Sequence, residues 1–237
     1  MLAATLGLSL AGVGVAATAD DQPIVFAAAS LTGVLPRIAP EAQFSFAGSN
    51  QLAQQIKQGA PVDVFLSASP KYTQDLYRAG LARKPVPFAT NTLVVIVPKS
   101  NSASIQAIGD LARRPKLRLV VAGPQVPVGL YTRRVLKRLG MLSVLRRAVS
   151  LEPDVKGIVA KVALGEADAG FVYATDARAV ATKVITIPIP ARAQPRVLYE
   201  VAVLTHTSRP DAALAFVVTL LSPDGHRELR AAGFGLP

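Results

Sequence analysis

Short apolar runs of strand length alternate with longer segments of helical periodicity along most of this 237-residue chain. The runs expected as strands are 23–29, 41–48, 62–68, 92–99, 117–123, 148–153, 169–175, 184–190 and 198–205. Helices are expected over 50–60, 70–80, 128–140 and 155–167, with two more within 211–234. Such alternation predicts the α/β class, with mainly parallel sheets that carry helices on both faces.

Two stretches of the chain correspond in kind. "IKQGAPVDVFLSA" (56–68) and "VALGEADAGFVYA" (162–174) each contain a helix end, a glycine, a short loop, an aspartate and an apolar strand. Each strand then ends in a hydroxyl residue followed by alanine. This correspondence predicts two lobes of similar topology. Two α/β lobes usually bind their ligand in the crevice between them, at the carboxyl ends of the strands.

The absence of cysteine excludes disulfides, thiol catalysis, cysteine-ligated metals and the acylated cysteine of a bacterial lipoprotein. His206 and His226 lie twenty positions apart with no carboxylate pattern around them, which argues against a histidine-based zinc site. We therefore expect no resident cofactor and no metal-ligating side chains. No apolar run after residue 20 is long enough to cross a bilayer.

The formal net charge of +11 has two interpretations, a solvated basic surface or an anionic partner. Nucleic acid is the weaker candidate for such a partner, because the chain has no tryptophan, no basic stripe interleaved with aromatic residues and no recognition motif. A small anion is compatible with the same charge, so we expect an anion rather than nucleic acid.

The first nineteen residues carry no charge and end in Ala17-Thr18-Ala19 before Asp20. An apolar stretch with a small-residue cleavage site is typical of a secretory signal peptide, although no basic residue follows Met1. The alternative is an N-terminal core helix. We expect residues 1–19 to be a signal peptide and the remaining chain to be exported.

Several expected helices begin directly after expected strands. Ser30 and Ser49 stand at two such junctions, and Val128 and Val155 open two further helices. Helix N-termini present unpaired backbone N–H groups and a positive dipole end, which together favour an anion. The alternative is that each serine only caps its helix and that Tyr173 is a core residue. Residue by residue, the sequence indicates a two-lobed anion-binding protein without settling this choice.

Enzymatic function has little support in the sequence. There is no Gly-x-Ser-x-Gly elbow, no phosphate loop and no carboxylate pair suited to acid–base work. We therefore expect that the protein is not an enzyme.

Longer motifs carry a family resemblance. "VFAAASLTGVL" (25–35), "FSFAGSNQLAQQIKQGAPVDVFLSAS" (44–69), "EPDVKGIVAKVALGEADAGFVYATDA" (152–177) and "YEVAVL" (199–204) occur in this order. In this order and spacing the chain resembles the periplasmic molybdate-binding proteins, the solute receptors of molybdate ABC importers. The resemblance implies a two-lobed type II periplasmic-binding-protein fold, with a soluble, monomeric receptor in the periplasm. It also implies binding of molybdate and tungstate, and delivery to a permease with its ATPase.

The resemblance also implies the ligand-binding residues. By motif position, the anion is held by the hydroxyls of Ser30, Ser49 and Tyr173 and by the backbone amides of Val128 and Val155. The same-fold alternatives are a receptor for another anion, such as sulfate or an organic anion, and an enzyme on a similar scaffold.

This chain departs from the family pattern at several positions. Gly48 stands where another small residue, often serine, is usual, Asn50 replaces serine or glycine, and Val128 replaces a common alanine. We expect Asn50 to alter the rim or reach the ligand, and Val128 to narrow the pocket. Pro36 lies in the segment of the first long helix, so we expect that helix to be short or bent.

The expected two-lobed fold also implies where the chain passes from one lobe to the other. We expect lobe 1 over 20–101 plus 200–237 and lobe 2 over 102–199, with the ligand cleft between them. The chain crossings at 99–104 and 196–200 are the expected hinges.

Overall fold

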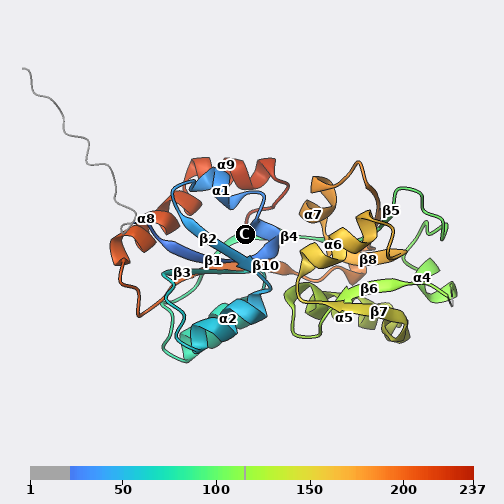
Figure 1. Ribbon diagram of the computed structural model, residues 1–237, viewed down its shortest axis with the longest axis horizontal. Coiled ribbons are helices and arrows are strands. Elements are labelled where there is room, and N and C mark those ends of the chain that lie inside the picture. The colour runs from blue at the N-terminus through green and yellow to red at the C-terminus, as the bar shows by residue number, and fades with distance from the viewer. Residues whose placement is uncertain (1–21, 115) are drawn as a thin grey trace, which may run out of the picture.

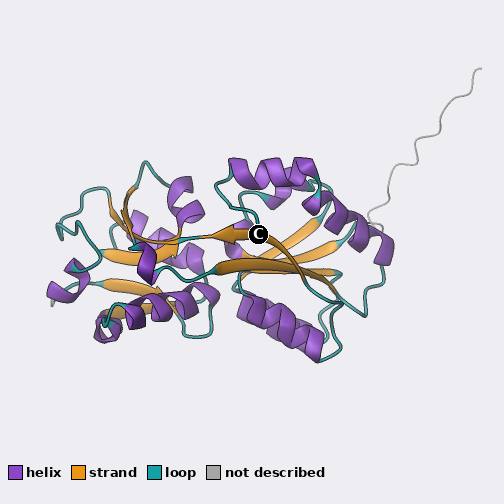
Figure 2. Cartoon of the chain, turned by 180° about the vertical axis from the view of Figure 1, so that it is seen from behind, coloured by secondary structure: helices purple, strands orange, loops and turns teal. Residues whose placement is uncertain are grey.

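The computed structural model describes residues 22–114 and 116–237, which form two lobes side by side (Figure 1). The expected signal peptide, 1–19, lies outside the described residues. Each lobe contains a five-stranded, mixed sheet with helices packed around it (Figure 2). The α/β class and the two-lobed architecture predicted from the sequence are confirmed.

The sheet of the first lobe has the strand order β2-β1-β3-β10-β4. Its strands are β1 (Ile24–Ala28), β2 (Gln43–Ala47), β3 (Val64–Ser67), β4 (Val86–Asn91) and β10 (Val197–Val203). Strands β1, β2 and β3 are parallel, whereas β10 is antiparallel to both of its neighbours. The helices are η2 (Ala29–Leu31), α1 (Leu35–Ile38), α2 (Ser49–Lys57), α3 (Pro70–Arg78), α8 (Pro210–Leu221) and α9 (Pro223–Ala231).

The sheet of the second lobe has the order β7-β6-β8-β5-β9. Its strands are β5 (Leu93–Pro98), β6 (Leu119–Ala122), β7 (Ala148–Glu152), β8 (Ala169–Tyr173) and β9 (Val184–Pro188). Strand β6 is parallel to β7 and β8, and β5 is antiparallel to β8 and β9. The helices are α4 (Asp110–Arg113), α5 (Pro127–Arg138), η3 (Leu142–Arg147), α6 (Val155–Ala163), α7 (Ala174–Ala179) and η4 (Ala191–Ala193).

The cores follow from the apolar pattern of the strands. Every residue of β3, β6 and β8 is buried, as expected for central strands covered on both faces. In the first lobe α2 lies on one face of the sheet and α1, α8 and α9 lie on the other; in the second lobe α5 lies opposite α6 and α7 (Figure 1). This arrangement directs the carboxyl ends of β1, β6 and β8 toward the gap between the lobes.

Two boundary predictions are wrong. Strand β5 pairs with β8 and β9, so residues 93–98 belong to the second lobe, and the first crossing falls at Thr92 between β4 and β5. The expected crossing at 99–104 therefore lies within the second lobe. Strand β10 begins at Val197, so the return to the first lobe precedes residue 200. At Thr92 the chain passes from one sheet to the other in an extended conformation, without a loop. Because no loop interrupts the apolar pattern there, the sequence did not indicate this crossing.

Strand β4 was not predicted. It carries Pro87, which removes a backbone donor, and it lies at the edge of its sheet, where proline is tolerated. The short first helix was predicted correctly: α1 has four residues and Pro36 lies in its first turn. Among the described residues, none of the helices has both the length and the apolar character needed to cross a membrane.

Candidate functional site

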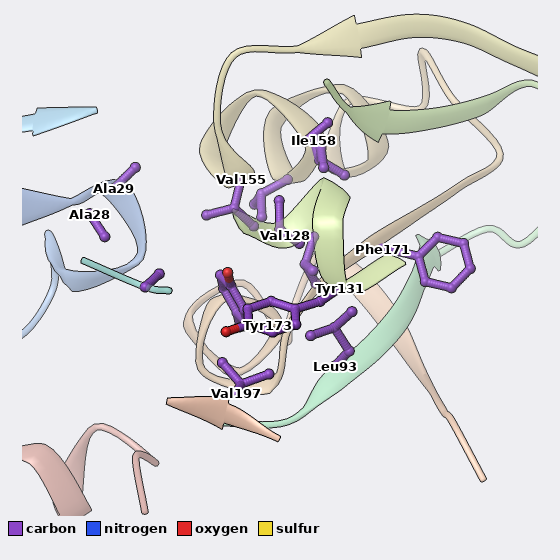
Figure 3. Close-up of a cluster of buried hydrophobic side chains, with 14 of the residues drawn as sticks. Ala28, Ala29, Leu93, Val128, Tyr131, Val155, Ile158, Phe171, Tyr173 and Val197 are labelled. Atoms are coloured by element: carbon purple, nitrogen blue, oxygen red, sulfur yellow. The ribbon is translucent and has the colours of Figure 1, made fainter. Parts of the chain in front are cut away.

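A small pocket lies between the lobes. It contains all five residues predicted as ligand-binding, Ser30, Ser49, Val128, Val155 and Tyr173. The other lining residues are small or apolar, apart from one carboxylate: Ala28, Ala29, Ala47, Gly48, Ala68, Val126, Pro127 and Asp154. In Figure 3, Ala28 and Ala29 lie on one side, and Val128, Val155 and Tyr173 lie on the other.

The first wall of the pocket is the junction of β1 and η2. Strand β1 ends in small residues, and the chain turns at Ala28 into the 3-10 helix that contains Ser30. Small side chains leave the backbone accessible to a ligand at this turn. The Ser30 side chain is buried, and its Oγ lies 2.9 Å from the Tyr199 hydroxyl. Ser30 is therefore a buried, oriented hydroxyl rather than a simple helix cap.

The N-terminus of α2 forms the neighbouring part of this wall. Gly48 is the N-cap, and Ser49 is the first helical residue. The backbone N–H of Ala68 donates a hydrogen bond of 3.1 Å to Ser49 Oγ. Because that lone pair is occupied by a protein donor, Ser49 has its own hydroxyl proton left for the pocket.

The second wall is formed by the N-termini of α5 and α6. Pro127 is the first residue of α5 and has no N–H, so Val128 supplies the first backbone donor of that helix. In α6 the N-cap Asp154 accepts from the amides of Lys156 (2.7 Å) and Gly157 (3.2 Å). The amide of Val155, the first helical residue, is left for the pocket. Both helix dipoles present their positive ends there.

Tyr173 ends β8 and is 2% exposed, yet its hydroxyl has no hydrogen-bond partner among residues 22–114 and 116–237. A buried polar group in that state costs free energy, so this hydroxyl is a candidate donor to a bound ligand. The ring is fixed by Tyr131 and Tyr199, with centroids at 6.5 Å and 5.9 Å. Burial raises the pKa of Tyr173 well above its usual value, which keeps the hydroxyl protonated as a donor.

The pocket is therefore built from neutral donors. Among the described residues, no lysine or arginine lines it and Asp154 is the one carboxylate that does; its Oδ1 accepts from two backbone amides of its own helix. Within residues 22–114 and 116–237, no three histidine, aspartate or glutamate side chains gather to hold a metal ion. The arrangement suits a small anion bound by hydrogen bonds.

Sequence reasoning missed several lining residues. Asp154 is the N-cap of α6, and its position directly before Val155 could have indicated it. Ala68 lines the pocket only because of how the chain folds, and no sequence pattern pointed to it. Asn50 was expected to reach the ligand or alter the rim, but it does not line the pocket; it is half-buried and its Oδ1 has no hydrogen-bond partner. Tyr199, which contacts Ser30, lies 169 positions away and left no local signal.

Comparison with known proteins gives the class. Residues 24–235 match the family described as "Bacterial extracellular solute-binding protein". The chain belongs to this family of extracellular solute-binding proteins.

Relatives with particular ligands are also similar to this chain. It is 40% identical over 224 residues to the molybdate-binding protein ModA of Mycobacterium tuberculosis, covering 90% of this chain and 84% of that one. It is 34% identical to ModA of Escherichia coli, with 86% and 85% covered. The periplasmic molybdate-binding protein of Azotobacter vinelandii has a similar structure, with a TM-score of 0.82 at 25% identity, covering 91% of this chain and 100% of that one.

Proposed function

We propose that this protein binds molybdate outside the cytoplasm and delivers it to an ABC importer. The observation that carries the proposal is the unpartnered hydroxyl of Tyr173, buried in a pocket where the hydroxyls of Ser30 and Ser49 and two helix N-termini meet. Relatives named as molybdate-binding proteins cover most of the chain, and this supports molybdate as the anion.

The proposed binding mode is a dianion held by uncharged donors. Hydrogen bonds to a charged acceptor are roughly twice as strong as neutral ones, so several of them replace much of the lost hydration. The hydroxyl of Tyr173 and the amides of Val128 and Val155 supply donors from the second lobe. The two serines supply donors from the first lobe. A bound anion then joins the lobes.

Selectivity follows from the same donors. Hydrogen phosphate carries a proton that enters a pocket lined mainly by donors, which disfavours it relative to a fully deprotonated dianion. Sulfate carries none but is smaller, and each donor that it fails to reach costs about 1–3 kcal/mol. Tungstate is nearly the size of molybdate, so we include it among the ligands.

The cellular setting is part of the proposal. The protein acts as a monomeric receptor in the periplasm, passes its anion to a permease with its ATPase, and performs no catalysis. Its charge of +11 attracts anions toward the cleft, an effect that salt weakens.

Thermal unfolding of the exported chain with molybdate, tungstate, sulfate and phosphate in turn tests the function. The chain has no tryptophan for a fluorescence titration, so melting is the practical measurement. A ligand at a thousandfold excess over its Kd stabilises the folded state by about 4 kcal/mol. We expect a large shift with molybdate and tungstate and little with the others. A larger shift with sulfate would make the protein a receptor for another anion, and no shift with any would overturn the proposal.

A further inference from the structure

We propose that Tyr199 and Asn91 are positioning residues that fix Ser30 as a hydrogen-bond donor toward the pocket, through the chain Asn91→Tyr199→Ser30. This inference rests on the proposed function and adds to it the origin of selectivity against protonated anions. All three side chains are at least nine-tenths buried, and Ser30 alone of the three lines the pocket.

The direction of the chain begins at Asn91, the last residue of β4. Its Oδ1 accepts a 2.9 Å hydrogen bond from the amide of Thr92. This bond fixes which end of the side-chain amide is oxygen and which is nitrogen. The Nδ2 group therefore faces the other way, where it donates to Thr175 Oγ1 at 2.9 Å and to the Tyr199 hydroxyl at 3.5 Å.

Tyr199 transmits the direction of hydrogen bonding from Asn91 to Ser30. An amide nitrogen has no lone pair to accept with, so the Tyr199 oxygen can only accept from Asn91. Its single proton must then go to the remaining partner, Ser30 Oγ, at 2.9 Å. With the opposite direction, the phenol proton would have no acceptor among the described residues. Burial raises the pKa of Tyr199 well above its usual value, so the proton stays in place.

The ring of Tyr199 is held firmly enough to maintain this geometry. It is 0% exposed and packs edge-on against Phe88 and Phe234, with centroids at 6.0 Å and 5.5 Å. The ring of Tyr173 lies 5.9 Å away on the side of the pocket. The hydroxyl therefore stays beside Ser30 without a ligand to place it.

The direction of these hydrogen bonds determines how Ser30 can act. Its oxygen accepts from Tyr199, and its own proton remains for the anion. Ser49 is arranged in the same way, with the amide of Ala68 in the role of Tyr199. Both serines of the first lobe thus keep their own proton for the anion, and each oxygen is turned toward a protein donor rather than toward the proton of hydrogen phosphate. A serine without such a partner could rotate and accept that proton.

The test is a mutant cycle on Ser30 and Tyr199, measured by calorimetric titration with molybdate and with inorganic phosphate. We expect Tyr199→Phe to weaken molybdate binding about tenfold, the scale of one oriented hydrogen bond to a charged group. In a Ser30→Ala background the same change should have almost no effect, since the serine it orients is gone. The ratio of molybdate to phosphate affinity should fall in Tyr199→Phe.

Two further variants complete the experiment. Tyr77→Phe is the control, because Tyr77 is 45% exposed and does not line the pocket. Asn91→Ala removes the first donor while keeping the phenol, and should change the affinity ratio in the same direction; it serves as the second variant if Tyr199→Phe folds poorly.

The outcomes separate the two proposals. A wild-type protein that binds molybdate, with Tyr199→Phe equal to Tyr77→Phe, overturns the positioning role alone. An equal loss from Tyr199→Phe with and without Ser30 also overturns it, because the effect would then not act through the serine. A wild-type protein that binds none of the oxyanions overturns the proposed function and the positioning role together.

Discussion

A Cβ atom on Gly48 would lie 2.4 Å from the carbonyl oxygen of Pro153. Gly48 caps α2 in the first lobe and Pro153 precedes α6 in the second, so the two backbones meet beside the pocket. Real Cβ atoms do not approach so closely, and any side chain at this position must push the lobes apart. Because Gly48 has no side chain, the two lobes can approach each other at this point.

We expect Gly48→Ala to weaken molybdate binding by about tenfold or more, since relief of such an overlap costs about 1–3 kcal/mol. Thermal stability without ligand should change little, because each lobe keeps its own core. Calorimetric titration measures the affinity, and small-angle scattering measures the opening of the lobes. Gly33→Ala is the control: Gly33 is exposed and a Cβ there meets nothing within 4 Å. Equal affinities for the two variants would contradict the prediction.

Tyr173→Phe should separate binding from stability. The hydroxyl is buried without a partner, so its removal should leave the ligand-free protein as stable as the wild type or more stable by about 1 kcal/mol. The same change should weaken molybdate binding at least tenfold, because it removes a donor to the anion. Melting without and with molybdate measures both effects. A destabilised ligand-free protein would mean that the hydroxyl has a protein partner.

The five residues that the family resemblance implies as ligand-binding line one pocket, whereas the path of the chain between the lobes was predicted only in part. The motifs around Ser30, Ser49 and Tyr173 are local, because each places a polar residue at the end of a strand or the start of a helix. Thr92 gave no such signal, since the chain stays extended on both sides of it while changing sheets. Tyr199 gave none either, because its partnership with Ser30 depends on β10 returning to the first lobe late in the chain.

Ser30→Ala and Ser49→Ala should both weaken molybdate binding, each by about tenfold, and both should also lower stability. Loss of Ser49 Oγ leaves the buried amide of Ala68 without its acceptor, which should destabilise the protein by about 1–3 kcal/mol. Loss of Ser30 Oγ leaves Tyr199 without an acceptor for its proton, at a similar expected cost. Titration and denaturant unfolding measure the two effects. Unchanged affinity in both variants would remove the serines from the binding site.

A second contact across the cleft joins Tyr72 of α3 to the loop before α5, where the tyrosine hydroxyl donates to the backbone carbonyl of Gln125. The bond links the two lobes, so we expect it to break when they separate. We expect Tyr72→Phe to weaken binding a few-fold, mainly through faster release of the anion, as for a single neutral hydrogen bond of about 1 kcal/mol. The rate at which the protein releases molybdate, followed by stopped flow, measures this effect. Tyr77→Phe on the same helix is the control, since Tyr77 is 45% exposed.

The buried carboxyl of Asp176, paired with the partly exposed Lys156, predicts a pH dependence. Asp176 is 1% exposed, Lys156 Nζ lies 2.7 Å from its Oδ1, and its Oδ2 has no hydrogen-bond partner. Burial raises the pKa of Asp176 despite the nearby lysine. A carboxyl whose pKa is raised by folding binds its proton more tightly in the folded state. Its contribution to stability is therefore complete below the unfolded pKa and is lost as pH rises from about 4 upward.

Asp176→Asn should abolish this pH-dependent loss of stability while keeping a hydrogen-bond acceptor for Lys156. We expect the unfolding free energy of the variant, relative to the wild type, to increase as pH rises from about 4 toward neutrality. Denaturant unfolding at a series of pH values measures this difference. Asp224→Asn is the control, because the Asp224 side chain is 80% exposed and its removal should give a nearly constant difference. A difference for Asp176→Asn that shrinks as pH rises would mean that Lys156 stabilises the carboxylate more than burial penalises it.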